Sequence, residues 1–385
     1  MFNNPFTPSF GGKPDFFFGR KEILLRFENA LTDRGSAERV LFLTGNRGCG
    51  KTALLEQCSQ MAAAHGWRTI DLNSENALSA LVRNLVRHRE STKTLAPEAS
   101  VNVLGSGISL GGISSSETTT YNKEDLGIVF LEACRDAKQG VFVSIDEVQK
   151  VDLKDLSLIC GAFQMASRKG YDVILAVAGL PYAYDAVIQY EGCTYMRRCA
   201  HERISVFTHS ETYDVLREAF EHVGSLEIDE RALDALVEAS FGHPYLIQLA
   251  GYCLVRFMNE QGNCSTYTID EKDVRTCLPE IIHLYTTRSL EPIVSALPAS
   301  ECRYLTAMAH VLDTERIAKT ADIAKHLGKS LQQVSPIRQR LLNEGNIVAV
   351  GRGKLMFNIP YLQEYLLSRE PQDTRESALA REWRF

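Results

Sequence analysis

The stretch from residue 40 to residue 55 constrains the fold of this chain more than any other. It reads Val-Leu-Phe-Leu-Thr-Gly-Asn-Arg-Gly-Cys-Gly-Lys-Thr-Ala-Leu-Leu. The apolar run 40–43 is typical of a buried strand, and residues from 53 onward have a helical composition. Between them, residues 45–52 fit the spacing of a phosphate-binding loop. A strand, a glycine-rich loop and a helix in this order predict an α/β fold that holds a nucleotide.

The chemistry of phosphate binding explains why these residue types occur in this order. Glycines let the backbone curl so that successive N–H groups point at the β-phosphate, and the following helix adds the positive end of its dipole. Lys51 can reach the β- and γ-phosphates, while the Thr52 hydroxyl can bind Mg²⁺. The alternative is a glycine turn that carries Lys-Thr by chance. The predicted ATP or ADP contacts are Gly45, Asn46, Arg47, Gly48, Cys49, Gly50, Lys51, Thr52 and Ala53.

A second apolar run, 141–145, ends in two carboxylates, Asp146 and Glu147. Asp146 at the end of a strand can hold Mg²⁺ through water, and Glu147 can polarise an attacking water molecule. We therefore predict Glu147 and Lys51 as catalytic residues, and Thr52 and Asp146 as metal ligands. A strand that ends in an acidic turn without a catalytic role is the alternative. Kinase activity, the transfer of a phosphoryl group to a second substrate, is not favoured, because the sequence shows no site for an acceptor substrate.

Composition narrows the class of protein. The chain has 385 residues, of which 45% are hydrophobic and 23% charged, and its net charge is −6. This length predicts two or three domains, and the charge gives no global sign of nucleic-acid binding. The N-terminus has no signal-peptide pattern, and no apolar run approaches the roughly 18 residues of a membrane span. The ten cysteines show no zinc spacing, so we expect a cytoplasmic protein with reduced thiols and no membrane partner.

Changes of pattern along the chain divide it into three predicted domains. Strands at 67–72, 141–145, 173–179 and 204–207 alternate with helices, which predicts a doubly wound parallel sheet within residues 1–208. A stretch rich in Ser, Thr and Gly at 91–121 is expected to be a surface insertion. Residues 209–295 are predicted to be helical only, before a linker marked by Pro292 and Pro298. The predicted helices are 211–222, 229–240 with Asp229 as its N-cap, 244–260, and 270–284 with Asp270 as its N-cap.

The last predicted domain, 296–385, has the element order of a winged helix-turn-helix. Helices are predicted at 300–311, 320–327 and 335–344, the last with Pro336 in its first turn. A hairpin of strands 347–350 and 355–357 follows, with a basic tip.

The charge of this segment suggests a partner. Residues 316–354 contain eight basic and two acidic residues in a chain of negative net charge. We predict double-stranded DNA as partner, bound through Arg338, Arg340, Arg352 and Lys354. The alternative is a solvated basic face on a domain that binds protein, and a homo-oligomer is also open.

Taken together, these residues resemble the AAA+-type ATPases related to archaeal and eukaryotic origin-recognition initiators, and more closely a group of bacterial ORC-like ATP-binding proteins. The matching residues are Asn4-Pro5-Phe6, Phe18-Gly19-Arg20, residues 45–52, Ile145-Asp146-Glu147, Ala178-Gly179-Leu180-Pro181, Gly242-His243-Pro244-Tyr245 with Gln248, Glu301-Cys302-Arg303-Tyr304-Leu305, and the terminal hairpin. The resemblance implies a P-loop AAA+-type core with a parallel sheet, an all-α lid and a C-terminal winged helix.

The resemblance also implies roles that the patterns alone do not give. Phe18, Gly19 and Arg20 would lie near the adenine. A finger arginine for a neighbouring subunit would come from Arg198, with Arg203 as second choice. Two departures from the family stand out: Ala178-Gly179 replaces a polar γ-phosphate sensor, and no early arginine follows Gly242.

These departures bear on the predicted function. We expect an ATP-binding, Mg²⁺-dependent ATPase that hydrolyses slowly and acts as a nucleotide-controlled switch. The alternatives are a signalling or defence scaffold ATPase whose winged helix binds protein, and a nucleotide-binding module without appreciable turnover.

Overall fold

The structure is a computed structural model that describes residues 2–8, 17, 19–93, 123–224, 226–262 and 267–369, with the backbone alone for 87–93 and 123–124. Phe18 and nearly all of the predicted insertion 91–121 lie outside the described residues. The chain forms two compact units. The sheet unit consists of Arg20–Gly45 and Lys51–Ile204, and the helical unit of Met1–Gly19, Asn46–Gly50 and Ser205–Phe385. The three-domain division remains a prediction.

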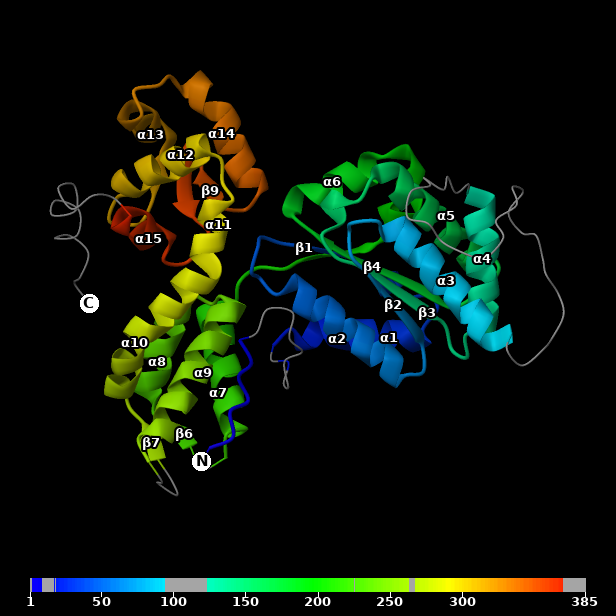
Figure 1. Cartoon of the computed structure of the whole chain (residues 1–385), viewed down its shortest axis with the longest axis horizontal. Coiled ribbons are helices and arrows are strands. Elements are labelled where there is room, and N and C mark those ends of the chain that lie inside the picture. The colour runs from blue at the N-terminus through cyan, green and yellow to red at the C-terminus, as the bar shows by residue number, and fades with distance from the viewer. Residues whose placement is uncertain are drawn as a thin grey trace. The chain divides into compact units, whose positions relative to one another are not determined.

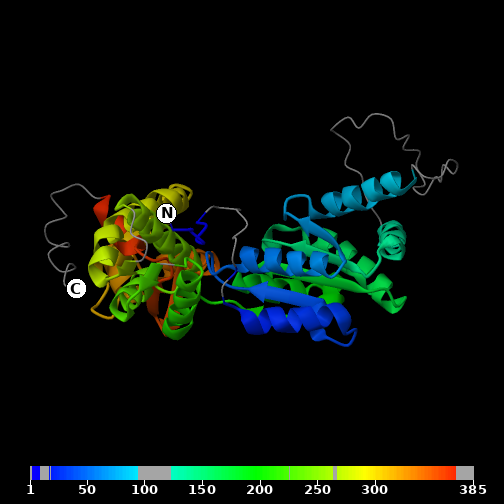
Figure 2. The same cartoon turned by 90° about the horizontal axis from the view of Figure 1, so that it is seen from below.

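The sheet unit is built on five parallel strands in the order β2-β3-β4-β1-β5. Helices α1 and α2 lie on one side of the sheet and α3 to α6 on the other, as Figures 1 and 2 show. The strands are β1 (Val40–Thr44), β2 (Arg68–Leu72), β3 (Val141–Ile145), β4 (Val173–Gly179) and β5 (Ala200–Arg203). The helices are α1 (Lys21–Thr32), α2 (Lys51–Ala64), α3 (Ala77–Lys93), α4 (Lys123–Asp136), α5 (Leu153–Arg168) and α6 (Pro181–Gln189).

Burial on both faces explains why the central strands are apolar throughout. All residues of β1, β3 and β4 are buried. Alternate residues face opposite layers. Phe42 packs into the core formed with α3 to α6, whereas Phe142 meets Phe27 of α1 with ring centroids 5.6 Å apart. The predicted parallel α/β core is therefore confirmed.

One predicted strand was misplaced. The apolar residues at 204–207 indicated the last strand, but β5 is Ala200–Arg203. Its partner β1 sets the register, with Leu41 opposite Ala200 and Thr44 opposite Arg203. β5 is an edge strand with three partly buried side chains and an exposed one, Arg203, so it lacks the apolar run on which the prediction relied.

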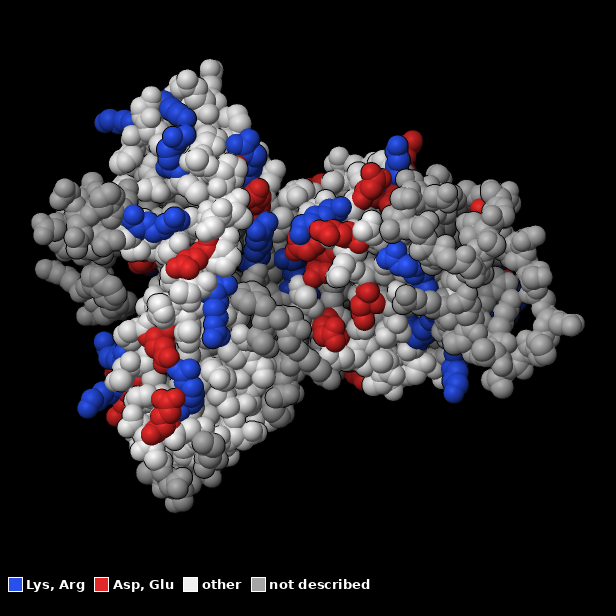
Figure 3. Space-filling view, in the orientation of Figure 1, with Lys and Arg blue, Asp and Glu red and all other residues white. Residues whose placement is uncertain are grey.

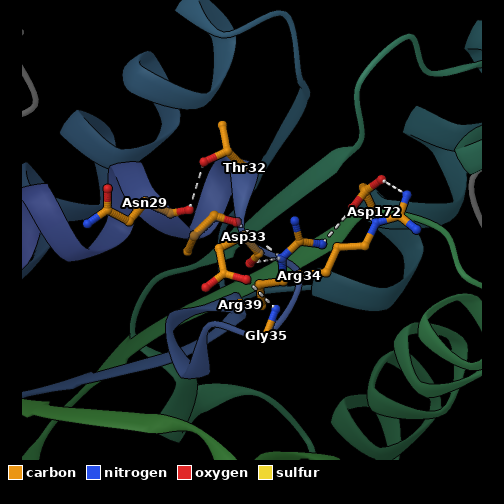
Figure 4. Close-up of polar contacts among 8 residues, drawn as sticks. Asn29, Thr32, Asp33, Arg34, Gly35, Arg39 and Asp172 are labelled. Carbon is orange, nitrogen blue, oxygen red and sulfur yellow. Dashed lines mark hydrogen bonds and ion pairs between the residues drawn. The ribbon is translucent and has the colours of Figure 1, made fainter.

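An ion-pair cluster fixes the start of the central strands (Figure 4). Asp172, just before β4, accepts hydrogen bonds from Arg34 at 3.0 and 2.5 Å and from Arg39 at 2.7 Å. Burial raises the pKa of Asp172, but the hydrogen bonds and charges of the two guanidinium groups outweigh it, so the pKa is lowered overall. Because Arg39 directly precedes β1, the cluster ties the starts of β1 and β4 together at the end opposite to the predicted site.

Four helices form the first part of the helical unit: α7 (His209–Glu221), α8 (Glu230–Ser240), α9 (Pro244–Glu260) and α10 (Glu271–Tyr285). Asp229 and Asp270 cap α8 and α10 as predicted, each accepting a hydrogen bond from a backbone N–H of the first turn. The N-terminal residues dock on these helices. Phe6 is buried, and its ring centroid lies 5.2 Å from that of Phe220.

The prediction of an all-helical segment before a linker needs two corrections. Strands β6 (Leu226–Ile228) and β7 (Tyr267–Ile269) form a two-stranded parallel sheet. The linker at Pro292 is helical: α10 continues through a π-helical turn, Thr286–Leu290, into α11 (Glu291–Ser295). Pro292 is the second residue of α11, so it lies within this continuous helical run and removes one N–H donor directly after the π-helical turn.

The rest of the helical unit, called here the C-terminal module, comprises residues 299–368. Its elements are α12 (Ala299–His310), β8 (Ala318–Lys319), α13 (Thr320–His326), α14 (Leu331–Asn343), β9 (Ile347–Gly351), β10 (Lys354–Phe357) and α15 (Leu362–Ser368). The three strands form a sheet in the order β8-β10-β9. Three helices followed by a hairpin match the element order predicted from the sequence.

Helix α14 begins earlier than predicted. It starts at Leu331 rather than at Ser335, because Ser330 and Gln333 form a capping box. The Ser330 hydroxyl accepts the Gln333 N–H at 3.3 Å, and the Gln333 side chain accepts the Ser330 N–H at 2.9 Å. Pro336 therefore lies inside the helix, and the exposed face gains one turn.

Candidate nucleotide-binding site

The two ends of the glycine-rich loop are anchored in the sheet unit. Gly45 follows β1, and its N–H donates a 3.2 Å hydrogen bond to the Gly179 carbonyl oxygen at the end of β4. Lys51 opens α2 and is only 5% exposed. Its Nζ donates a 2.9 Å hydrogen bond to the Gly45 carbonyl oxygen. The ammonium group is thus held beside Gly45, just after the end of β1.

The middle of the loop, Asn46–Gly50, packs within the helical unit. Gly48 and Gly50 have φ values of +78° and +93°, which side chains disfavour. A Cβ on Gly48 would lie 2.1 Å from Nε2 of His243. Cys49 is buried, with its Sγ 3.0 Å from the Asn46 carbonyl oxygen. Both conformation and space therefore require glycine at 48.

Thr52 and Asp146, the two predicted metal ligands, are in direct contact. Thr52 Oγ1 donates a 2.6 Å hydrogen bond to Asp146 Oδ2. A hydroxyl and a carboxylate oxygen are the hard donors that Mg²⁺ prefers, so these residues fit the metal. In the part of the chain that the structure describes, no group of three or more His, Cys, Asp or Glu could hold a metal by itself. The donor set therefore suits an ion that also binds substrate phosphates.

Glu147 follows Asp146 in a left-handed conformation, with φ 53° and ψ 42°. Such a conformation is uncommon for a residue other than glycine, and it turns the chain sharply at the end of β3. Gln149 Nε2 donates a 2.7 Å hydrogen bond to Glu147 Oε2, and Lys150 Nζ lies 3.6 Å from the same oxygen. The carboxylate is therefore held by neighbours on one of its two oxygens.

The remaining predicted nucleotide contacts are scattered between the two units. Ala53 is the third residue of α2. Gly19, in the helical unit, has a φ of +79°, and a Cβ there would lie 2.8 Å from the Phe207 ring. Arg20, in the sheet unit, is left-handed and precedes α1. Phe18 lies outside the described residues.

The predicted finger arginines are exposed. Arg198 ends a 3₁₀ turn, Glu191–Arg198, and Arg203 is the last residue of β5. The third arginine of this tract, Arg197, is engaged locally, because its Nε donates to the Ile188 carbonyl oxygen at 3.0 Å. Arg198 and Arg203 thus keep the exposure that their predicted role requires.

The sequence reasoning missed two residues of this region. Gln149 carries no motif, and its contact with Glu147 depends on the 3₁₀ turn Val148–Lys150. His243 belongs to one of the runs that carry the family resemblance, but its residue type predicted no role; it is 7% exposed, and its Nδ1 has no hydrogen-bond partner. A histidine just before the proline that opens a buried helix was the only signal.

The predicted DNA contacts of the C-terminal module differ in their surroundings. Arg352 and Lys354 are exposed at the hairpin tip. Arg340 is instead engaged with Glu301, a buried carboxylate 2.7 Å away. Arg338 is partly buried, and its Nε has no hydrogen-bond partner. Arg340 is thus exposed but already paired with a carboxylate, and Arg338 is only partly exposed.

A basic surface nevertheless remains on the module. Lys354 and Lys319 are directly opposite each other in the antiparallel pair β10–β8. On the face shown in Figure 3, basic side chains gather over α13 and the upper part of α14. The exposed members of this surface, called here the basic edge, are Lys319, Lys325, Lys329, Arg352 and Lys354.

The fold and these contacts define the class of protein: an ATPase whose phosphate-binding loop follows the first strand of a parallel sheet. Residues 17–175 match the family described as AAA ATPase domain, and residues 289–366 match a domain family of unknown function. The first match identifies an AAA ATPase domain within the chain.

Solved structures share this fold. The ORC2 protein of Aeropyrum pernix in ADPNP–ADP complexes is 15% identical, with a TM-score of 0.63, over 99% of this chain and 100% of that one. Its ADP form is 16% identical, with a TM-score of 0.50, over 90% and 91% of the chains. No curated protein sequence is similar enough to this chain to count as a match. At such identities these structures show the fold, which is ORC-like, while a closer kinship with bacterial proteins remains a prediction.

The helices of the described residues include none with both the length and the apolar composition of a membrane span.

Proposed function

We propose that this AAA+ ATPase is a Mg²⁺-dependent switch that binds ATP tightly, hydrolyses it slowly and binds DNA in one nucleotide state. The hydrogen bond between Thr52 and Asp146 carries the nucleotide part, because it brings the loop hydroxyl to the acidic strand end. The Aeropyrum pernix ORC2 protein forms ADPNP–ADP complexes, and this supports ATP and ADP as ligands of the present chain. Gly45 to Ala53 would then cradle the phosphates, with Gly19 and Arg20 near the base.

Each residue at the end of the sheet has a separate task in this proposal. Lys51 neutralises phosphate charge, and Glu147 accepts the proton of an attacking water molecule. Thr52 and Asp146 hold Mg²⁺, which when bound neutralises charge that develops on the phosphate oxygens.

Slow turnover is supported by the end of β4. Ala178 and Gly179 have no polar side chain there, so β4 offers the γ-phosphate no side-chain donor. A slow step keeps the ATP-loaded state long-lived, which suits a switch.

The DNA part of the proposal is carried by the pair Lys319 and Lys354. Like charges directly opposite each other in a β-ladder repel, and an anion that binds both relieves this cost. Arg352 extends the same edge at the hairpin tip. A row of exposed cations fits a phosphate backbone, and we interpret the C-terminal module as a winged helix that binds double-stranded DNA by this basic edge. Arg338 and Arg340 would contribute little to it.

The test is fluorescence anisotropy of a labelled DNA duplex with the full chain in ATP at increasing salt. Binding should weaken steeply with salt through counterion release, and Lys319→Gln with Lys354→Gln should lower the salt slope by roughly two. The matched control is Lys138→Gln with Lys169→Gln, which removes the same charge from the sheet unit. No binding at low salt in any nucleotide state would overturn the DNA proposal and leave the ATPase intact.

A protein partner is the second candidate, because two large apolar side chains lie exposed on the module. Leu331, at the start of α14, is 56% exposed, and Val350 of β9 is 45% exposed. In that case Leu331→Ser with Val350→Ser would abolish the interaction, while the lysine variants would preserve it.

A further inference from the structure

One peptide unit at the end of β4 links two parts of the proposed site. The carbonyl oxygen of Gly179 accepts the Gly45 N–H at 3.2 Å. The N–H of the same peptide, which belongs to Leu180, donates a 3.1 Å hydrogen bond to Gln149 Oε1. A single rigid peptide plane is therefore bonded to the glycine-rich loop on one side and to the Gln149 side chain on the other.

The Gln149 carboxamide continues this chain of hydrogen bonds to Glu147. Its Oε1 accepts from Leu180, so its Nε2 is the donor that remains, and it bonds to Glu147 Oε2 at 2.7 Å. Both hydrogen-bonding ends of the amide are thus used, which fixes its orientation. Among the described residues no hydrogen bond involves Glu147 Oε1, so this oxygen is left to accept a proton from water.

Gly179 provides the space in which the amide lies. A Cβ at this position would be 2.8 Å from Gln149 Oε1 and 2.8 Å from Val148 Cγ1. The backbone of Gly179 is an ordinary strand conformation, so its torsion angles do not demand glycine. The glycine is instead explained by the side chain of Gln149, which occupies the place of a residue-179 side chain.

The backbone of Glu147 brings Gln149 into this place. Its left-handed conformation and the 3₁₀ turn that follows reverse the chain, so that a side chain two residues later returns to the carboxylate. Left-handed residues other than glycine are strained and tend to occur where function demands them.

We propose that Gln149 is a positioning residue that holds the Glu147 carboxylate in its water-polarising orientation and ties it, through the Gly179–Leu180 peptide, to the glycine-rich loop. The inference rests on the proposed role of Glu147 and adds a residue that acts through it. Without the amide, the carboxylate rotates about three side-chain bonds, and its alignment is lost in most conformations.

The variant that tests this is Gln149→Met, which keeps the volume and removes both hydrogen bonds. The single-turnover rate of phosphate release, with protein in excess over ATP, should fall roughly ten- to a hundredfold. The Kd for ATP should stay within about twofold of the wild type, because Gln149 contacts no part of the loop by its own side chain. The matched control is Gln60→Met in α2, which makes the same substitution and removes the 2.9 Å hydrogen bond from Gln60 Nε2 to Glu56 Oε1 away from the proposed site; it should keep the wild-type rate.

The decisive measurement is the double variant with Glu147→Gln. If Gln149 acts only through the carboxylate, Gln149→Met adds no further loss in the Glu147→Gln background. Losses that multiply, an unchanged rate in Gln149→Met, or a weaker Kd would each overturn the positioning role and leave Glu147 as the base. An unchanged rate in Glu147→Gln itself would overturn the proposed function. Should Gln149→Met fail to fold, Gln149→Asn gives the same test, since its amide is one methylene too short to bridge.

Discussion

Arg340 Nε donates a 2.7 Å hydrogen bond to Oε1 of Glu301, whose side chain is only 2% exposed, whereas that of Arg340 is 54% exposed. Helices α14 and α12 are thus joined by a carboxylate inside the C-terminal module. Glu301 Oε2 has no hydrogen-bond partner, so Arg340 provides the main compensation for a buried charge.

We expect Arg340→Met to destabilise the C-terminal module, because it leaves this carboxylate buried without its cation. A lost hydrogen bond to a charged group costs about 1.5–3 kcal/mol. Urea unfolding followed by circular dichroism measures the change. Adding Glu301→Gln should recover most of it, and Arg352→Met, at the exposed hairpin tip, is the control that should change little. Equal effects of Arg340→Met and Arg352→Met would contradict a structural role for the pair.

Two substitutions separate nucleotide binding from hydrolysis. Lys51→Ala should abolish ATP binding, since Lys51 contacts phosphate in the ground state. Glu147→Gln should retain binding and lose roughly 10²–10⁴ in the rate of hydrolysis, because Glu147 acts on the water. Isothermal titration measures the affinity for ATP, and phosphate release measures the rate of hydrolysis. Equal ATP affinity of wild type and Lys51→Ala would contradict the assignment of the loop.

The parallel sheet of the sheet unit could be predicted because each of its central strands has a clear pattern in its own short stretch of sequence. The central strands are buried on both faces, so each is a continuous apolar run that needs no knowledge of its neighbours. The Thr52–Asp146 contact followed from the same logic, since parallel strands deliver their carboxyl ends to one edge of the sheet. The same reasoning misplaced the edge strand β5, because this strand is not fully buried and its register depends on β1.

The missed features are those that depend on contacts between distant segments. The hydrogen bond from the Leu180 N–H to Gln149 Oε1 joins residues 31 positions apart, and the ion pair of Arg340 with Glu301 joins residues 39 apart. Neither leaves a periodic trace in the sequence. The start of α14 was misplaced for a local reason: Pro336 suggested a first turn, whereas the capping box at Ser330 decided it.

Gly48→Ala should destabilise the helical unit even without nucleotide. The new Cβ would lie 2.1 Å from His243 Nε2 in a backbone with φ +78°. Gly50→Ala is the matched control, because its φ of +93° is equally unfavourable but its nearest neighbour is Pro244 Cγ at 3.6 Å. The stability difference between the two variants should be about 1–3 kcal/mol. This difference should become smaller when His243 is also replaced by alanine. If it stays the same there, a clash between the new Cβ and His243 is not its cause.

Arg198 is expected to act on a neighbouring subunit. If it is a finger arginine, ATP turnover per chain should rise with protein concentration, and Arg198→Ala should remove the rise. Arg203→Ala tests the second choice, and Arg197→Ala is the control, since Arg197 is bonded to Ile188. Turnover independent of concentration, together with sedimentation that shows no assembly in ATP, would argue against any finger arginine here.

His243 makes the stability of the helical unit depend on pH. Burial lowers the pKa of His243 to about 4, from a usual value of 6.5. Between these two values the unfolded chain binds a proton that the folded chain excludes, so stability decreases as the pH falls from about 6.5 towards 4. The shift corresponds to a loss of about 3 kcal/mol when the titration is complete. Above pH 7 the residue is neutral in both states and contributes no pH dependence.

Urea unfolding of wild type and His243→Leu from pH 7.5 to pH 4.5 isolates this contribution. Burial also lowers the pKa of His201 in the sheet unit, so the wild type has more than one histidine that destabilises it in acid. Both proteins keep His201, and the difference between them therefore reports His243 alone. We expect the stability of His243→Leu relative to wild type to rise steadily below pH 6.5, by about 1.4 kcal/mol for each pH unit. If the two proteins showed the same pH dependence of stability, His243 would be protonated as readily in the folded protein as in the unfolded chain. That result would contradict the lowered pKa of His243.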